Sequence, residues 1–296
     1  MLVSGADGFT GRYVCRELQR RGITCIALLR PGRDAGWMER HGLPVRRADL
    51  NDSAALAEAL QGCRALLNVA SIGFGAAPAI LEACRRAGVR RAVFVSTTAI
   101  FTRLAAPSKR LRQEAEAAIR ASGLDTTILR PTMIYGSPAD RNMIRLVRWL
   151  ARCPLLPVVG DGRSLQQPVL VRDVAWAIVA VLDRPETHGQ AYNLSGAAPL
   201  TYNAVVVATA AALGRRPLLL HLPLAPCVAL LRLAERLRLR LPLRAEQLQR
   251  LNEPKAFDHT PAREVFGYSP VGFPEGIARE VALWRLGPDW TREAWR

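Results

Sequence analysis

The chain has 296 residues, of which 50% are hydrophobic, so it is long enough to bury a sizeable core in one large α/β unit or in two small domains. Six scattered cysteines without a Cys-x-x-Cys pair argue against a disulfide framework and predict reduced thiols. The net charge is +16, and arginine supplies almost all of the positive charge, since Lys109 and Lys255 are the only lysines. Without an aromatic-interleaved basic patch or a helix-turn-helix signal, we predict no nucleic-acid partner.

Short β-branched or leucine-rich runs alternate with helical stretches through the first part of the chain. The expected strands cover residues 1–4, 23–29, 45–48, 65–69, 92–96 and 126–129. The expected helices between them include residues 12–21, 54–60 and 78–87. This alternation is typical of βαβ units and predicts an α/β fold with a doubly wound parallel sheet. The first strand begins at residue 1 and leaves no room for a secretion signal, so we expect a cytoplasmic protein.

Three glycines follow the first expected strand and open the first expected helix. They are Gly5, Gly8 and Gly11, with Phe9 and Thr10 between the last two. In this context the first glycine permits the tight turn, the second lets the backbone approach a pyrophosphate, and the third allows close packing of helix on strand. The free amides at the helix start favour an anion. We therefore predict that this turn binds NAD or NADP on a Rossmann-type sheet.

The remaining motifs extend this prediction over most of the chain. The turn Val3-Ser4-Gly5-Ala6-Asp7-Gly8-Phe9-Thr10-Gly11 resembles that of extended and atypical short-chain dehydrogenases/reductases, the epimerase/dehydratase-like group, and the likeness continues through the ends of the third to sixth strands and residues 167–175. The resemblance implies that Asp49 and Leu50 flank the adenine. It also implies that Asn68, Val69 and Ala70 line the ribose side, with Pro131 and Ile134 near the nicotinamide.

Cofactor choice is read at the end of the second strand. An acid there would bind the ribose 2′-hydroxyl, and an arginine would accommodate a 2′-phosphate. The chain has Arg30, with Arg33 close behind, and Asp34 is read as the N-cap of the next helix. We favour NADP over NAD, and ordinary surface arginines remain the alternative.

The catalytic pattern of the resembled group is incomplete. Ser96, Thr97 and Thr98 fill its hydroxyl position, and Ser96 is also expected at the cofactor. Lys109 resembles the lysine of its Tyr-x-x-x-Lys motif, which implies a ribose contact, but Ala105 replaces the tyrosine. Three hypotheses follow: Lys109 itself assists proton transfer, another hydroxyl such as Tyr135 or Thr98 does so, or the site is catalytically inactive and the chain is a cofactor-binding regulator or assembly subunit.

After Pro131 the pattern loosens into loops with several glycines and prolines, followed by a helix from about Val171 and a largely helical C-terminal region. We expect a Rossmann unit of residues 1–135, joined by about 171–195, and a smaller, mostly helical, interlocked substrate cap of residues 136–170 and 196–296. Arg163 resembles a nucleotide-sugar contact of epimerases, and Arg141 and Asn142 can join it at a diphosphate; turn residues and exposed arginines are the alternative.

Residues 218–251 form a leucine- and arginine-rich stretch that is too interrupted to span a bilayer. It either lies on the inner membrane face as a peripheral contact or packs as an ordinary cap helix, which we favour.

The histidines show no ligand spacing, so we predict no metal. The sequence thus predicts an NAD(P)-dependent oxidoreductase or epimerase acting on a small molecule, a sugar on a nucleotide or lipid diphosphate, with a homo-oligomer left open.

Overall fold

The computed structural model describes residues 1–104, 107–237, 249 and 252–291. Seven parallel strands form one sheet. In order across the sheet they are β11 (Ala191–Leu194), β6 (Asp125–Pro131), β5 (Arg91–Val95), β4 (Ala65–Asn68), β1 (Leu2–Ser4), β2 (Ile26–Leu29) and β3 (Val45–Arg47). The order reverses between β1 and β4, which confirms the predicted doubly wound sheet and places a ligand crevice at that switch point. The six expected strands are all present, and β11 is an additional seventh.

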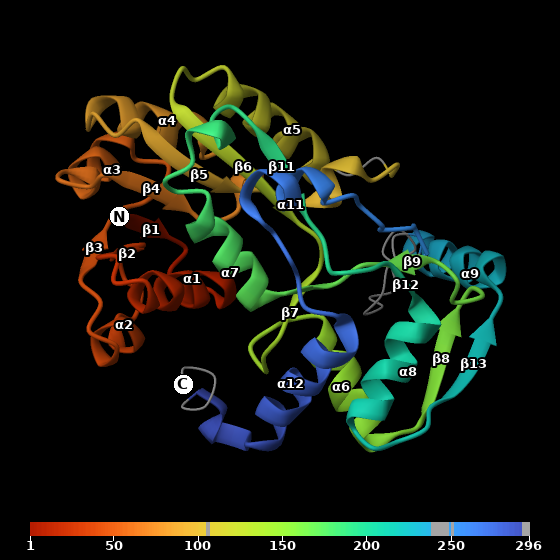
Figure 1. Ribbon diagram of the computed structural model, residues 1–296. Coiled ribbons are helices and arrows are strands. Elements are labelled where there is room, and N and C mark those ends of the chain that lie inside the picture. The colour runs from red at the N-terminus through yellow and green to blue at the C-terminus, as the bar shows by residue number, and fades with distance from the viewer. Residues whose placement is uncertain (105–106, 238–248, 250–251, 292–296) are drawn as a thin grey trace.

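Helices cover both faces of the sheet (Figure 1). One face carries α1 (Phe9–Arg20), α2 (Gly36–Arg40) and α7 (Val171–Ala180), and the other carries α3 (Ser53–Leu60), α4 (Ala77–Arg86) and α5 (Pro107–Arg120). Successive strand residues feed opposite cores, because side chains alternate along a strand. Leu2, for example, packs towards α3 and α4, whereas Val3 packs towards α1 and α7.

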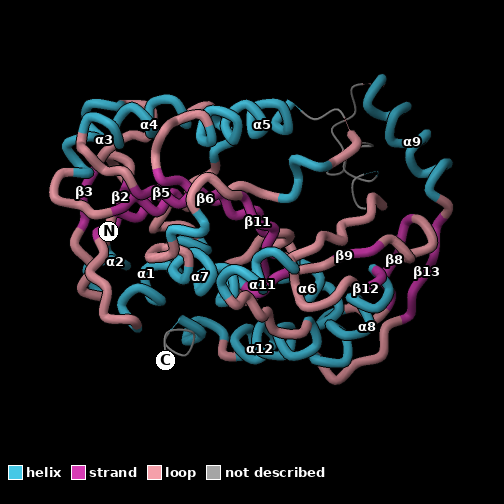
Figure 2. The backbone as a smooth tube through the Cα atoms, turned by 45° about the horizontal axis from the view of Figure 1, so that its top comes forward, coloured by secondary structure: helices cyan, strands magenta, loops and turns pink. Residues whose placement is uncertain are grey.

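A smaller part of the molecule lies beyond the carboxyl ends of the strands, at the right of Figure 2. Its helices are α6 (Met143–Arg152), α8 (Tyr202–Ala212), α9 (Leu224–Arg236) and α12 (Phe273–Arg285). Three two-stranded sheets join them: β7 (Ile134–Tyr135) with β10 (Val169–Leu170), β9 (Leu165–Gln166) with β12 (Leu200–Thr201), and β8 (Leu155–Val159) with β13 (Leu218–Leu222). This part therefore contains more strand than the sequence indicates.

The chain crosses between the two parts more than once. Helix α7 and β11 return to the large sheet within residues 171–195. Helix α11 (Thr260–Phe266) also packs there, with Phe266 and Tyr268 in the same core as α1 and α7. Residues 260–268 thus lie against the sheet, although the sequence assigns them to the cap. All six cysteines are free, and within the described ranges no helix is long and apolar enough to cross a membrane.

Candidate functional site

The glycine turn lies at the switch point of the sheet. Gly5 has a φ of +64°, and a Cβ there would lie 2.9 Å from the amide nitrogen of Ala70 at the end of β4. A Cβ at Gly11 would collide with the carbonyl oxygen of Gly5. Gly8 is the N-cap of α1 and lends no side chain to the helix amides. The turn therefore leaves an uncovered helix N-terminus where backbone can approach an anion closely, which fits a dinucleotide pyrophosphate.

The end of β4 closes the other side of this turn. Asn68 is 1% exposed, and its amide donates to the carbonyl of Ala70 at 3.0 Å and accepts the Ser4 hydroxyl at 2.7 Å. Its side chain is thus engaged within the protein and holds the backbone in place. Val69 and Ala70, by contrast, line the cavity described below. At this strand end, the surface available to the predicted cofactor therefore consists of backbone and the side chains of Val69 and Ala70.

Arginines gather at the end of β2. Arg30 is exposed, and Arg33 pairs with Asp7 at 2.7 Å. The Asp34 carboxylate accepts the Gly36 amide at 3.0 Å; the N-cap itself is Ala35, one residue later than predicted. Arg12, which the sequence analysis did not single out, lies with its guanidinium 5.1 Å from the centre of the Trp37 ring.

Arg12 is half-buried, and burial lowers the pKa of its guanidinium, an effect that Arg40 and Arg33 reinforce. Its Nε has no hydrogen-bond partner among the described residues. On the adenine side predicted for Asp49 and Leu50, the Asp49 carboxylate accepts the Asn51 amide at 2.8 Å, which lowers its pKa. Leu50 is partly buried against the α3 core. Cations thus outnumber acids around the end of β2.

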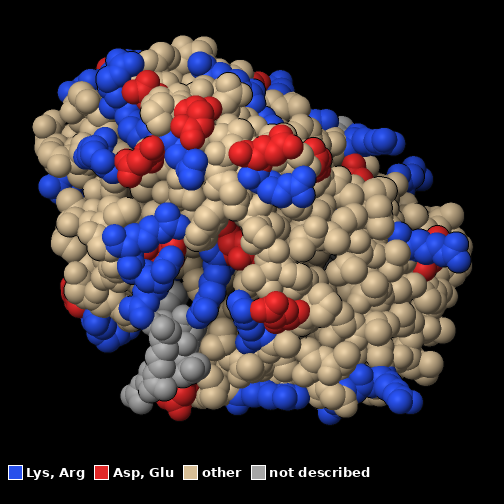
Figure 3. All heavy atoms as spheres, in the orientation of Figure 1, with Lys and Arg blue, Asp and Glu red and all other residues tan. Residues whose placement is uncertain are grey.

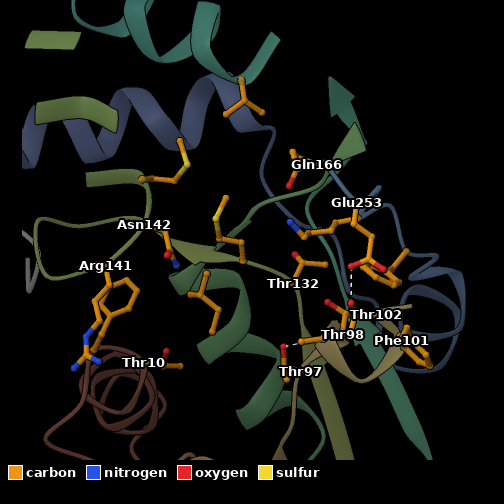
Figure 4. Close-up of a pocket in the computed structure, with 18 of the residues that line it drawn as sticks. Thr10, Thr97, Thr98, Phe101, Thr102, Thr132, Arg141, Asn142, Gln166 and Glu253 are labelled. Carbon is orange, nitrogen blue, oxygen red and sulfur yellow. Dashed lines mark hydrogen bonds between the residues drawn. The ribbon is translucent and has the colours of Figure 1, made fainter. Parts of the chain in front are cut away.

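A cavity of about 1070 Å³ extends from the glycine turn into the cap (Figure 4). Its wall includes the predicted cofactor residues Gly5, Gly8, Phe9, Thr10, Gly11, Val69, Ala70 and Ile134. Apolar side chains from the cap and from the loop after β5 make up much of the remainder: Phe101, Met133, Met143, Leu146, Val205 and Phe257. Four cations and one carboxylate also line it: Arg103, Arg141, Arg145, Lys255 and Glu253. The cavity can accept an elongated ligand with apolar and anionic parts.

Hydroxyl groups follow β5 at one wall of this cavity. Thr97 and Thr98 line it, whereas Ser96, with a buried hydroxyl that has no described partner, lines an adjoining cavity of about 320 Å³ together with Pro131. The Thr97 hydroxyl oxygen accepts the Ala99 amide at 3.2 Å. The Thr98 hydroxyl is directed at the carbonyl of Pro131 at 3.5 Å. The ends of β5 and β6 are therefore joined next to the cavity.

Lys109 occupies a different place from the one that the resemblance implies. Its Nζ donates to the carbonyl of Thr102 at 2.7 Å, and the side chain is absent from the cavity wall. The Thr102 hydroxyl in turn donates to the Glu253 carboxylate at 2.6 Å, whose other oxygen accepts the Arg103 amide at 2.6 Å. Lys109 thus contacts the loop that contains Thr102 and Arg103, and this loop separates it from the cavity. Ala105 lies outside the described residues.

Tyr135 cannot serve as the substitute acid in this arrangement, which corrects the second hypothesis for Tyr135 and leaves its other candidate, Thr98, in the cavity wall. The residue is fully buried, packs against Phe273 at a ring distance of 5.2 Å, and its hydroxyl has no described partner. Burial raises the pKa of its hydroxyl far above the ordinary value. Alternation along β7 directs the neighbouring Ile134 to the cavity and Tyr135 to the core between β7 and α12.

The predicted substrate residues separate into two groups. Arg141 and Asn142 line the cavity, and Figure 4 shows Arg141 on the side of Thr10 and the α1 helix. Arg163 is exposed in a turn, its amide bonded to Asp161 at 2.9 Å, and does not line the cavity. We therefore set Arg163 aside as a turn residue.

Sequence reasoning missed the residues that reach the cavity from the far end of the chain. Glu253, Lys255 and Phe257 follow the leucine- and arginine-rich stretch and carry no motif. Their position depends on Gln167, whose side-chain oxygen accepts the Phe257 amide at 2.9 Å and whose nitrogen donates to Gly196 at 2.7 Å. The one sequence signal was Lys255, which is one of only two lysines.

Comparison with known proteins identifies the group to which this architecture belongs. Residues 5–185 match the protein family described as NAD(P)H-binding. The chain belongs to this NAD(P)H-binding family. The match agrees with the predicted resemblance to short-chain dehydrogenases/reductases and supports a nicotinamide cofactor.

Two reductases are similar to this chain in sequence, and a dehydratase is similar to it in fold. The 2-alkyl-3-oxoalkanoate reductase of Stenotrophomonas maltophilia is 27% identical over 94% of this chain and 97% of that protein. The ceramide reductase of Caulobacter vibrioides is 29% identical over 75% of this chain and 73% of that protein. A dTDP-glucose 4,6-dehydratase from Streptomyces venezuelae, DesIV, solved as a double mutant with NAD, superposes with a TM-score of 0.74 at 21% identity, covering 100% of this chain and 99% of that one.

Proposed function

We propose that this chain is an NADP-dependent oxidoreductase that reduces a carbonyl group, or oxidises the corresponding alcohol, on a substrate joining an anionic group to an apolar chain. The observation that carries the proposal is the continuous cavity of about 1070 Å³, which begins at the glycine turn, passes the hydroxyls of Thr97 and Thr98, and ends among apolar cap residues. A scaffold that only binds a cofactor has no need of such a cavity beyond the cofactor's own space.

The residues present fit a nicotinamide dinucleotide. A side chain at Gly5 would meet the backbone of Ala70, and one at Gly11 would meet the backbone of Gly5, so only glycines allow the tight turn that a pyrophosphate site requires. Arg30 and Arg12 supply cations for a 2′-phosphate, since Arg33 is already paired with Asp7 and Asp34 with a backbone amide. The bound cofactor supplies or accepts the hydride; the remaining work falls to the side chains of this chain.

Thr97 is the group best placed to polarise the reacting oxygen. Its hydroxyl oxygen accepts the Ala99 amide, which leaves its proton without an acceptor among the described residues and free to be donated into the cavity. The Thr98 proton is directed at the Pro131 carbonyl instead. A hydroxyl held in this way stabilises negative charge as it develops on the substrate oxygen.

Glu253 is proposed as the proton-exchanging group in place of the missing tyrosine. It is the only carboxylate among the residues described in the cavity wall, and Figure 4 shows it beside Thr102 on the side of the cavity that carries Thr98. During reduction the protonated form of Glu253 gives its proton to the substrate oxygen and becomes the carboxylate, and during oxidation the carboxylate receives that proton. Lys109 acts through the Thr102 carbonyl as a positioning residue.

The cavity wall supports the substrate class. Phe101, Met133, Met143, Leu146 and Phe257 suit an alkyl chain, while Arg141, Arg145 and Lys255 suit a carboxylate or phosphate. A 2-alkyl-3-oxoalkanoate, named for the relative that aligns over nearly the whole chain, combines these features. A sugar carried on a nucleotide or lipid diphosphate is the second candidate. It is favoured by Arg141, which Figure 4 shows on the side of Thr10, and by Arg145, which also lines the cavity.

The test is a turnover assay with NADPH and NADH at the nicotinamide absorbance band, using a 2-alkyl-3-oxoalkanoate in one series and nucleotide-sugars in another. We expect NADPH consumption with the oxo acid, reduced by Thr97→Val and unchanged by Thr24→Val, an exposed threonine outside the cavity wall. Product analysis accompanies the sugar series because an epimerase returns its hydride. Cofactor binding without turnover of either class would favour the non-catalytic regulator or assembly subunit.

A further inference from the structure

The two-stranded sheet of β8 and β13 is apolar on both faces. Leu156, Val158 and Leu219 point inward and pack with α8. The alternate residues point outward, and the register pairs Leu218 with Leu155 and Leu220 with Pro157 on that outer face. All four are exposed, Leu218 by 67% and Leu220 by 50%. A sheet that only packs against its own cap would carry polar residues on the outer face.

Helix α9 repeats this arrangement. Val228 and Ala234 are buried, and Leu231 packs with Val228 against the body of the cap. Leu230, Leu233 and Leu237 lie on another side of the helix at spacings of three and four, and each is more than half exposed. An ordinary cap helix packs its leucines inward, and these three depart from that expectation. Residues 238–248 and 250–251 of the predicted membrane stretch lie outside the described residues.

The charge around these apolar residues is mostly positive. Residues 141–160 and 203–237, which contain α6, β8, β13, α9 and most of α8, include eight arginines and one acidic residue, the exposed Glu235. Arg148, Arg152, Arg215, Arg216 and Arg232 are exposed. Figure 3 shows a broad uncharged area over this part of the molecule, with basic side chains along its lower edge. The half-exposed Trp149 lies alongside, its indole donating to the Leu155 carbonyl at 3.0 Å.

We propose that the outer faces of β8, β13 and α9, with these arginines, form a docking surface for an anionic lipid membrane. Exposed leucines and a tryptophan among arginines suit the boundary between lipid acyl chains and negatively charged headgroups. The positive charge also favours a membrane over a second copy of the chain as the binding partner. A second copy would place its own arginines against these, and like charges that face each other oppose association.

The surface and the cavity share a helix. Arg145 and Leu146, in the first turns of α6, line the cavity, and Arg148, Trp149 and Arg152 follow in the next turns. A membrane-bound orientation therefore holds the cavity near the lipid phase, where a substrate with an apolar chain resides. The docking surface stands on its own exposed residues and does not depend on the proposed catalytic activity.

The test is co-sedimentation of the full chain with vesicles of equal parts phosphatidylcholine and phosphatidylglycerol, beside vesicles of phosphatidylcholine alone. We expect binding to the anionic vesicles that weakens with added salt. Arg215→Gln with Arg216→Gln should weaken it about tenfold or more, because each arginine near such a surface contributes appreciably. The matched control is Arg85→Gln with Arg86→Gln, an adjacent pair at the end of α4.

The apolar part is tested by Leu218→Ser with Leu220→Ser and, separately, by Leu230→Ser with Leu233→Ser, with Phe74→Ser as the control for an exposed apolar residue elsewhere. NADPH binding and circular dichroism verify that each variant is folded. Loss of vesicle binding in folded leucine variants supports the proposal. The proposal would be overturned if the wild-type protein did not bind anionic vesicles, or if only the arginine substitutions reduced binding. It would also be overturned if light scattering showed a dimer that the leucine substitutions convert to monomers.

Discussion

The hydroxyl of Thr102 donates a 2.6 Å hydrogen bond to the carboxylate of Glu253, which lies 151 positions further along the chain. This bond joins the loop after β5 to the segment that returns from the cap, and both residues line the cavity. It brings a carboxylate to the cavity wall of a chain whose Tyr-x-x-x-Lys motif lacks its tyrosine.

Glu253→Gln should lower kcat by about a hundredfold or more, because it removes a proton-exchanging group while keeping the shape of the side chain and one of its two acceptor oxygens. Steady-state rates and NADPH titration measure the two effects, and the affinity for NADPH should change little. Glu264→Gln, outside the cavity, is the matched control. An unchanged kcat and pH profile in Glu253→Gln would remove the carboxylate from the proposed chemistry.

Lys109→Met should lower kcat and leave the dissociation constant of NADPH within about threefold, because the ammonium holds the Thr102 carbonyl and does not face the cavity. Fluorescence titration of the nicotinamide and initial rates separate the two quantities. A large loss of NADPH affinity with little other change would instead restore the ribose contact that the resemblance implies.

Gly5→Ala and Gly22→Ala form a matched pair, since the two glycines have φ values of +64° and +68°. Each alanine should cost about 1–2 kcal/mol of stability from the left-handed backbone. Only Gly5→Ala also brings a Cβ within 2.9 Å of the Ala70 amide; nothing lies within 4 Å at Gly22. Calorimetric titration should show weakened NADPH binding for Gly5→Ala alone. Equal affinities in the two variants would contradict the assignment of the turn.

Arg30→Ala and Arg12→Ala should each reduce the preference for NADPH over NADH by about tenfold or more, the effect of a charge-assisted hydrogen bond to the 2′-phosphate. Arg20→Ala, an exposed arginine of α1 that pairs with Glu17, is the control. Parallel titrations with both cofactors give the ratio. If wild type already binds the two cofactors equally, the arginines have no part in selection.

Glu280 should make stability fall at alkaline pH. It is fully buried, and burial together with a hydrogen bond to Asp140 raises its pKa from 4.5 to about 10. The folded state thus holds a proton that the unfolded state releases, so the contribution of Glu280 to stability is full below about pH 4.5 and is lost as the pH rises towards 10. The decline is at most about 1.4 kcal/mol per pH unit.

Glu280→Gln removes this dependence, and thermal unfolding at several pH values should show a smaller alkaline loss than in the wild type. Glu82→Gln, an exposed residue of α4, should retain the wild-type slope. Coincident slopes in all three proteins would show that Glu280 is already ionised when folded. Because Asp140 also accepts the Asn142 amide at 2.7 Å, the same titration should loosen a residue of the cavity wall.

The sequence by itself determined the sheet and the cofactor turn. The spacing of apolar residues along a strand or helix is a local property, so it suffices to predict the elements of the sheet. Gly5, Gly8 and Gly11 lie within one strand-to-helix connection, so their spacing suffices to predict the turn. The seventh strand was not recognised separately, since Ala191–Leu194 is short and its parallel pairing with β6 joins residues about sixty positions apart in sequence.

Tertiary structure decided the rest of the site. Whether Tyr135 faces the cavity or the core depends on the pairing of β7 with β10, and whether Lys109 reaches the cavity depends on where Thr102 is held. Glu253 enters the wall only because Gln167 and Thr102 bind the returning segment. Such contacts between distant segments are set by packing and hydrogen-bond satisfaction in three dimensions, which no local pattern encodes.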